Sequence, residues 1–529
     1  MKHRKPGVAL LLKPTALVAL LALAGCATTA PELGLDAERQ QTNLVDRSAM
    51  RQDVEPLAGA LTLDEALARA LKYNLDRRMR MMEEALALNQ LDVSKFDMLP
   101  KLVAQAGYNT RSNDRISNSR DEATGAPSTS RFVSSDRNHV VNELGLTWSL
   151  LDYGLGYYGT RQQESRLLIA TEKRRKAMHV LMQDVRTAYW RAASAQKLRG
   201  EVSKTITMAE EALADARKVE GERLRNPLDS LRYQRQVLEN LRLLEAIEQE
   251  LSSAQVELAT LINAPLGQPI QIAEPEVQAA GSAVLGLPLA QLEEAALGQN
   301  PDLREQHYNA RIARDETRKT LMRLFPNVSF NYALKYDSDS YLVNRDWNEA
   351  GLQISFNLFN LMTADAQLKL AEAGVKLADQ RRMATQMAVL TQVHLARLQL
   401  LNARNQYDRA EAIYDTDRKI AEHVRNRENA KAQSKLERVS QETAYILSLL
   451  RRYQALAQVQ VAENRLLANL GLEPQIGSTG ELTLAQLSEQ LRQDANPWSR
   501  LPAPAPAPAT APAPTPVVGE PAAAEGVRP

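Results

Sequence analysis

The chain contains two copies of one unit, and this duplication restricts its fold more than any other feature of the 529 residues. Over the 40 positions from Leu61 to Pro100, a shift of 226 places nine residues on identical ones without a gap. Further along the best shift falls to 208, so the first copy holds 18 extra residues between Pro100 and Leu144. A duplicated unit predicts that each structural element occurs twice. The nine residues are Leu61, Leu63, Ala70, Leu71, Asn74, Asp76, Arg78, Ala87 and Pro100, which fall on Leu287, Leu289, Ala296, Leu297, Asn300, Asp302, Arg304, Ala313 and Pro326.

The first predicted element of each copy is a helix. Thr62 and Glu65 have the spacing of a capping box, so the helix of the first copy should begin there and run to about Asp97, before Pro100. In the second copy the corresponding helix should be interrupted or start afresh near Pro301 and end before the matching proline. Each copy therefore opens on a helix that ends at a proline.

Two long helices are predicted at the end of each copy. Residues 159–224 contain no proline, and about 60 helical residues would span about 90 Å at roughly 1.5 Å per residue. Residues 228–262 repeat apolar side chains every seven positions, which indicates helices packed along a seam. A two-stranded coil and a helical bundle share this local pattern. The seam consists of Val237, Leu244, Leu251 and Leu258, joined by Ile247, Ala254 and Leu261; the second copy keeps Ala455, Val459, Ala462 and Leu466 but has Arg452 in the seam.

Between the helices, apolar residues alternate with polar ones, which is the period of a strand. Each copy has two such segments of roughly 9–11 residues, a length that crosses a bilayer within a β-barrel. Half-buried strands of soluble sheets alternate in the same way, so the membrane interpretation also depends on the export signal and anchor described below. The apolar positions are Leu102, Ala104, Ala106 and Tyr108; Leu144, Leu146, Trp148 and Leu150; Val328, Phe330, Tyr332, Leu334 and Tyr336; and Leu352, Ile354, Phe356 and Leu358.

Four strands per chain are too few to close a barrel in lipid. Free strand edges would leave backbone groups without hydrogen bonds in hydrocarbon, and known barrels have at least about eight strands. Neighbouring copies of the chain must therefore complete the barrel if these segments enter a membrane. Residues 110–138, which are almost free of apolar side chains, are predicted to form a long loop outside the cell.

The first 26 residues are predicted to be a targeting signal. A basic stretch precedes an apolar segment, residues 15–24, that is too short to span a bilayer. The segment ends Leu23-Ala24-Gly25-Cys26, which resembles the bacterial lipobox, in which cleavage after Gly25 leaves Cys26 as the lipidated N-terminus. An ordinary signal peptide with a chance cysteine is the alternative. By the same resemblance, Ala27 favours the outer membrane over the inner one, and several acyl chains would anchor the protein firmly.

The composition argues against several classes of function. Lys and Arg (65) balance Asp and Glu (64), which leaves no excess of basic charge for binding nucleic acid. Cys26 is the only cysteine, and the six histidines are never closer than 29 residues, so we expect no catalytic residue, no metal site and no cofactor other than the lipid on Cys26. Residues 497–529 contain 10 prolines, mostly alternating with alanine, and are expected to form a disordered tail.

In this order, these features resemble the TolC-type family of outer-membrane efflux and secretion channels, and the lipobox resembles its lipoprotein branch. The resemblance covers about residues 60–472 and implies a mainly α-helical fold with transmembrane β-strands. Three chains would close one twelve-stranded barrel as a homotrimer, and the long helices would form a periplasmic tunnel. The resemblance is carried by the duplication, by Asn300-Pro301-Asp302-Leu303-Arg304 before a helix that ends Leu324-Phe325-Pro326, and by Ser355-Phe356-Asn357-Leu358-Phe359-Asn360.

The resemblance also implies partners and a gate. Substrates would pass from an inner-membrane pump through a periplasmic adaptor (membrane fusion) protein into this channel, which would lie in outer-membrane lipid. The periplasmic tip of the second copy should be the turn around residues 425–431, where the family narrows the opening with acidic residues. Glu437 matches the first acidic position of that gate, and Ser440 stands where a second acidic residue can occur. The basic neighbours Lys431, Lys435 and Arg438 leave the charge of this gate open.

Two alternatives remain for function and for the aromatic residues. The chain is either an efflux or secretion conduit, or a non-conducting, lipid-anchored periplasmic helical scaffold with a small soluble sheet. Four aromatic residues lie near predicted strand ends and either form interfacial girdles or pack internally: Trp148, Tyr157, Tyr158 and Trp347.

The predicted plan of the chain is a signal peptide (1–25), a lipidated extension (26–60), the first repeat (61–268), a linker (269–285), the second repeat (286–474), a helical segment (475–496) and the tail (497–529).

Overall fold

The computed structural model describes residues 37–221, 227–273, 282–430, 435–477, 479–494 and 497–501. The predicted signal peptide, Cys26 and almost all of the Pro/Ala-rich tail lie outside these residues. The chain divides into two units, residues 1–55 and 56–529. The first unit contains helix α2 (Ala37–Arg51), whose described side chains are all exposed. All other described elements belong to the second unit.

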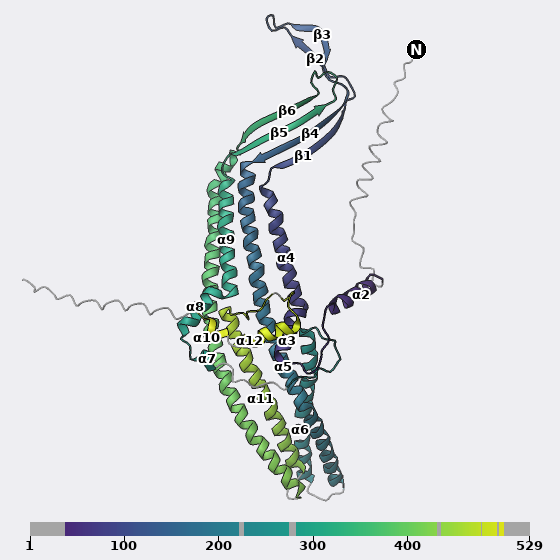
Figure 1. Cartoon of the computed structure of the whole chain (residues 1–529), viewed down its shortest axis with the longest axis vertical. Coiled ribbons are helices and arrows are strands. Elements are labelled where there is room, and N and C mark those ends of the chain that lie inside the picture. The colour runs from purple at the N-terminus through teal and green to yellow at the C-terminus, as the bar shows by residue number, and fades with distance from the viewer. Residues whose placement is uncertain are drawn as a thin grey trace, which may run out of the picture. The chain divides into compact units, whose positions relative to one another are not determined.

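The second unit has the duplicated order of elements that the sequence predicts. In Figure 1 its four-stranded sheet lies at one end of the long helices, and the paired ends of α5 with α6 and of α10 with α11 lie at the other. A short helix, α7 (Ser282–Leu285), separates the copies, and α12 (Leu484–Gln493) and η2 (Pro497–Arg500) follow them. The first copy comprises α3 (Leu63–Tyr73), α4 (Leu75–Lys95), η1 (Phe96–Met98), β1 (Lys101–Thr110), β4 (Asn138–Ser149), α5 (Leu150–Gly221) and α6 (Pro227–Leu261). The second comprises α8 (Leu289–Gln299), α9 (Pro301–Met322), β5 (Asn327–Asp337), β6 (Asp346–Ser355), α10 (Phe359–Asn429) and α11 (Lys435–Leu470).

Within the described ranges, none of the helices combines the length and the apolar character that crossing a membrane requires.

The prediction of one continuous helix from Thr62 to about Asp97 is wrong, because the chain breaks at Asn74. Asn74 is extended (ψ 130°), its side chain accepts a hydrogen bond from Arg77 N at 3.0 Å, and its Nδ2 donates to Leu261 O at 3.1 Å. Asn300 breaks the second copy in the same way, and its Nδ2 donates to Asn469 O at 2.9 Å. The duplication therefore preserves an asparagine that caps one helix and holds the end of another.

Two further boundaries differ from the prediction. Helix α5 begins at Leu150 rather than near Gly159, because Ser149 Oγ accepts a hydrogen bond from Asp152 N at 3.0 Å at its first turn. A Cβ at Gly156 would meet Asp97 O at 2.9 Å, so the glycine allows α5 to lie close to η1. The predicted loop at residues 110–138 contains a hairpin, β2 (Ile116–Arg120) and β3 (Pro127–Val133). Its strands pair Ile116 with Val133 and Ser117 with Phe132.

The seven-residue repeat forms a buried seam, as predicted. Val237, Leu244, Leu251 and Leu258 of α6 are at most 6% exposed. Residues of α5, α6 and α11 share one buried cluster, so the seam belongs to a helical bundle and not to a two-stranded coil. Arg452 is tolerated in the equivalent seam of α11 because it pairs with Glu411 at 2.5 Å and lies over the ring of Tyr414.

The four long strands form one antiparallel sheet in the order β1-β4-β5-β6. The two copies meet in its centre, where β4 pairs with β5, for example Leu144 with Leu334. Strands β1 and β6 each have one neighbour in the described sheet and therefore form its two edges. The sheet thus presents two strand edges that a second chain can continue.

Candidate functional site

The two faces of the sheet differ in chemistry and in exposure. The face of the sheet that carries Phe330 and Leu334, here called the apolar face, holds most of the large apolar side chains of the strands. Phe330 and Leu334 are 44% and 43% exposed, whereas Ser329 and Ala333 on the opposite, polar face are 9% and 8% exposed. In the central strands, the more exposed face is thus the apolar one, which reverses the arrangement of a sheet in water.

The charged residues of the four strands lie almost entirely on the polar face. The strand register assigns every Asp, Glu, Lys and Arg of β1, β4, β5 and β6 to this face except Asp346, at the start of β6. This set consists of Lys101, Glu143, Lys335, Asp337 and Glu349. An apolar outer face and a charged inner face are typical of a barrel that encloses water in a membrane.

The register separates the aromatic residues predicted to form girdles. Trp148 pairs with Phe330 on the apolar face, where a girdle residue would lie. Trp347 pairs with Lys335 and so lies on the polar face, away from the lipid side of such a barrel. Tyr157 and Tyr158 belong to α5, with their ring centroids 5.2 Å apart. The girdle role remains a prediction for Trp148, Tyr157 and Tyr158, and the register argues against it for Trp347.

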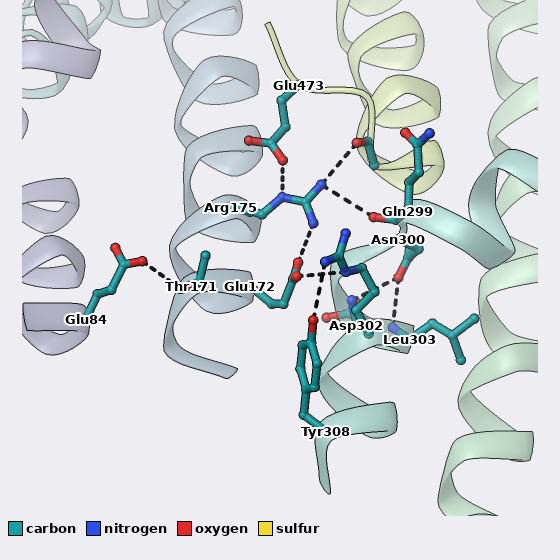
Figure 2. A network of polar contacts seen from close by, with 12 residues as sticks. Glu84, Thr171, Glu172, Arg175, Gln299, Asn300, Asp302, Leu303, Tyr308 and Glu473 are labelled. Carbon is teal, nitrogen blue, oxygen red and sulfur yellow. Dashed lines mark hydrogen bonds and ion pairs between the residues drawn. The ribbon is translucent and has the colours of Figure 1, made fainter. Parts of the chain in front are cut away.

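A network of charged side chains joins three parts of the second unit around Arg175 of α5 (Figure 2). The Arg175 guanidinium donates to the carboxylates of Glu172 and Glu473 and to the carbonyl oxygen of Gly471. Glu172 is 3% exposed and also pairs with Arg304 of α9 at 2.9 Å. The network therefore ties α5 to α9 and to the segment after α11, and the buried charge of Glu172 has two cationic partners.

Contacts beside this network also join α4 to α5 and the end of α11 to the break between α8 and α9. Glu84 of α4 accepts hydrogen bonds from Thr171 Oγ1 and Arg174 Nε, each at 2.6 Å. A Cβ at Gly471, which has φ +69°, would approach Gln299 O to 2.2 Å. Glycine is thus required where the end of α11 touches the break between α8 and α9. Figure 2 shows Thr171, Glu172 and Arg175 on neighbouring positions of α5, with Glu84 on one side and Glu473 on another.

The segment after the second copy contacts α3 and α4 of the first copy and α11 of the second. Lys72 Nζ of α3 donates to Leu482 O at 2.8 Å, and Arg77 Nη2 donates to Thr479 Oγ1 at 3.0 Å. Trp498 Nε1 donates to Glu463 Oε1 of α11 at 3.2 Å. Residues 475–501 thus connect α3, α4 and α11 instead of forming a separate domain.

A cavity of about 460 Å³ lies between α3, α5, α11 and α12, and Asp64, His179, Arg186 and Glu463 line it. Burial lowers the pKa of His179 to about 4, so its imidazole is neutral at pH 7. Burial raises the pKa of Glu463, against the opposing effects of Trp498 and Arg186. Among the described residues, no group of three His, Cys, Asp or Glu side chains is placed to hold a metal ion. The cavity therefore offers polar groups but no recognisable catalytic arrangement.

At the far end of the long helices, four contacts join α11 to its neighbours, and we call this set the tip latch. Arg425 of α10 donates to Glu442 Oε1 from Nε and Nη2, at 3.0 and 2.7 Å. This bond raises the pKa of Arg425, and Glu442 is 5% exposed. The other contacts are Arg438 with Glu428 at 2.7 Å, Lys435 with Asp215 of α5 at 3.0 Å, and Asn240 of α6 with Ser440 at 3.2 Å.

Of the two predicted gate residues, Ser440 belongs to this latch and Glu437 lies beside it. Glu437 is in the first turn of α11, is half-buried, and accepts a hydrogen bond from Gln441 Nε2 at 3.1 Å. Ser440 Oγ accepts from Asn240 Nδ2, so this residue ties α11 to α6. The basic residues that left the gate charge open, Lys435 and Arg438, have acidic partners. Residues 425–429 of the predicted turn belong to helix α10 instead, and Lys431 lies outside the described residues.

Sequence reasoning missed Arg175, Glu172 and the pair of Arg425 with Glu442. Charged residues are frequent on all the long helices, so their sequence positions do not identify which ones meet. The one available signal was the Asn300-Pro301-Asp302 segment, since a residue that caps a helix start marks a place where chain segments converge.

A protein-family model matches part of the chain. The family model described as outer membrane efflux protein matches residues 292–472, which is most of the second copy. No curated protein matches the chain in sequence.

Solved structures of outer-membrane channels share the fold. The channel OprN is 17% identical over 77% of this chain and 89% of its own, with a TM-score of 0.60. The CmeC channel of Campylobacter jejuni is 14% identical over 81% of this chain and 89% of its own, with a TM-score of 0.59. The MtrE channel of Neisseria gonorrhoeae is 17% identical over 76% of this chain and 88% of its own, with a TM-score of 0.57. At these identities, the similarity concerns the fold.

Proposed function

We propose that this chain, whose residues 292–472 belong to the TolC-like outer membrane efflux protein family, is the outer-membrane channel of a tripartite efflux system. The observation that carries this function is the reversal of the sheet, which exposes Phe330 and Leu334 and turns Glu143 and Lys335 to the other face. Lipid against the apolar face and water against the polar face satisfy both sets of side chains. The protein is not an enzyme.

Three copies of the chain form the channel in this proposal. The edges β1 and β6 join neighbouring chains, so that three four-stranded sheets close one barrel of twelve strands and leave no backbone group unpaired in lipid. Helix α10 supports the assembly because it exposes a row of large apolar side chains that a neighbouring chain can cover. These include Leu361, Met362, Leu370, Leu377, Met387, Leu395 and Leu398.

The proposed assembly extends from the outer membrane into the periplasm. The long helices form the periplasmic tunnel, and the ends of α10 and α11 face a periplasmic adaptor protein and an inner-membrane pump. Lipidation of Cys26 anchors each chain beside the barrel, as in the lipoprotein branch of the family. Glu437 and Ser440 lie at the periplasmic entrance, and the tip latch holds that entrance closed until the adaptor separates α10 from α11.

The membrane part of the proposal predicts that the lipid anchor is dispensable for insertion. Cys26→Ser protein should still require detergent for extraction, migrate as a trimer and produce ion channels in planar bilayers, because its apolar strands remain in lipid. Sucrose-gradient fractionation, native electrophoresis and conductance recordings measure these properties. A Cys26→Ser protein that is monomeric and soluble in plain buffer would favour the periplasmic scaffold instead.

The gate part predicts that Arg425→Gln opens the channel. The substitution removes both hydrogen bonds to Glu442, and a charge-assisted bond of about 1.5–3 kcal/mol should raise the ratio of open to closed channels about tenfold or more. Open probability in planar bilayers is the measurement. The control is Arg418→Gln on the same helix, because both arginines are about half exposed but Asp415, at 3.4 Å from Arg418, is 50% exposed whereas Glu442 is buried; this variant should have little effect. Equal open probabilities for the two variants would remove the latch from the gate.

A further inference from the structure

The strand register brings four large side chains of the polar face into one row across the sheet. Gln105 pairs with Glu143, Glu143 with Lys335, and Lys335 with Trp347. Glu349 lies on the same face, two residues after Trp347 in β6 and therefore in the next row.

The charges in this region do not cancel. Lys335 Nζ pairs with Glu349 Oε2 at 2.8 Å, and Glu143 flanks the same lysine across the strand pair. One ammonium group therefore faces two carboxylates, which leaves one negative charge per chain at ordinary pH. The next row holds Gly145 and Ala333, and a Cβ at Gly145 would lie 3.4 Å from Glu143 Oε1, so the Glu143 carboxylate extends over the space above the glycine.

Trp347 adds an aromatic surface at the same level. It is 38% exposed, and its neighbour on the polar face is Lys335. An indole attracts cations to its face, most strongly when the cation is partly removed from water. A lysine-bound carboxylate, a second carboxylate and an exposed indole together form a surface that favours positively charged, aromatic molecules over anions.

We propose that Glu143, Glu349 and Trp347 make the barrel selective for cations and give it a weak binding site for aromatic organic cations. The inference rests on the proposed function, because only a trimeric barrel converts this surface into a ring around a water-filled lumen. A ring of net negative charge raises the local concentration of cations and lowers that of anions. The substrate class that this surface suits best is therefore the organic cation with an aromatic ring.

Ion selectivity tests the charge. In planar bilayers under a KCl gradient at low ionic strength, where screening is weakest, Glu143→Gln/Glu349→Gln should lower the ratio of potassium to chloride permeability about twofold. Lys335→Gln should raise the ratio, because it leaves both carboxylates and removes the ammonium. These opposite changes exclude a general loosening of the barrel as the cause.

Block by an organic cation tests the indole. Tetraphenylphosphonium added at the outer side should reduce the current through the natural protein more than tetraethylammonium does, and Trp347→Leu should abolish the difference between the two ions. An unchanged difference would overturn the aromatic part of the inference. An unchanged permeability ratio in both charge variants, with a changed ratio in Glu437→Gln, would assign selectivity to the tip and overturn the rest. If the natural protein forms no channels, the proposed function itself fails.

Discussion

Replacing Leu334 by arginine should prevent the chain from assembling in the outer membrane. Leu334 lies in β5 on the apolar face, pairs with Leu144, and is 43% exposed, so in the barrel its side chain points into lipid. An arginine on the lipid side of a barrel costs about 2–4 kcal/mol near the middle of the bilayer, and the cost recurs in every chain of a trimer. In the Cys26→Ser protein, which has no lipid anchor, we therefore expect Leu334→Arg to be lost from the outer-membrane fraction and to accumulate as monomer in the periplasm.

The same substitution on the other face is the matched control for Leu334→Arg. Asn331 lies in the same strand on the polar face, where it pairs with Thr147 and Gly351. A Cβ at Gly351 would meet nothing within 4 Å, so there is room for a longer side chain above this row. Asn331→Arg should insert and assemble normally. Fractionation and native electrophoresis of both variants measure the difference, and equal behaviour of the two would contradict a lipid-facing sheet.

The sequence predicted the elements whose signal is local and periodic. Alternation over residues such as Phe330, Tyr332 and Leu334 identified the strands, because the period of two is a property of the strand itself. The seven-residue repeat identified the seam of α6 for the same reason, and the duplication supplied a second, independent reading of each element. Local periodicity combined with a repeat was sufficient for the architecture of one chain.

The sequence did not predict the features that depend on distant partners. Asn74 breaks a helix because its side chain binds Leu261 O, 187 residues further along the chain. The chain around Asn74 alone is compatible with a continuous helix, and only the packing of α6 decides the matter. Trp347 shows the same limit at the proposed functional surface, because the strand pairing assigns it to the face of Lys335, whereas its position near a strand end suggested a girdle.

Arg175 shows most clearly how contacts between distant segments hold the unit together, and replacing it should destabilise the protein strongly. Arg175→Met keeps most of the volume of the side chain but leaves Glu473 and the carbonyl oxygen of Gly471 without their donor. Glu172, which is 3% exposed, keeps only Arg304 of its two cationic partners. Breaking a buried ion pair on one side costs about 3–5 kcal/mol, so we expect a loss of about 3 kcal/mol or more in the free energy of unfolding.

The neighbouring Lys176→Met is the control for Arg175→Met, and their comparison separates a buried charge from an exposed one. Lys176 lies on the same turn of α5 and pairs with Asp302 at 2.8 Å, but its side chain is 57% exposed. An exposed ion pair contributes about 0–1 kcal/mol, so this variant should unfold almost like the natural protein. Denaturant unfolding in detergent, followed by circular dichroism, measures both. Adding Glu473→Gln to Arg175→Met should restore part of the loss, because it removes the carboxylate that the first substitution left unpaired. If Arg175→Met and Lys176→Met unfold at the same denaturant concentration, the network around Arg175 does not hold α5 to the segment after α11.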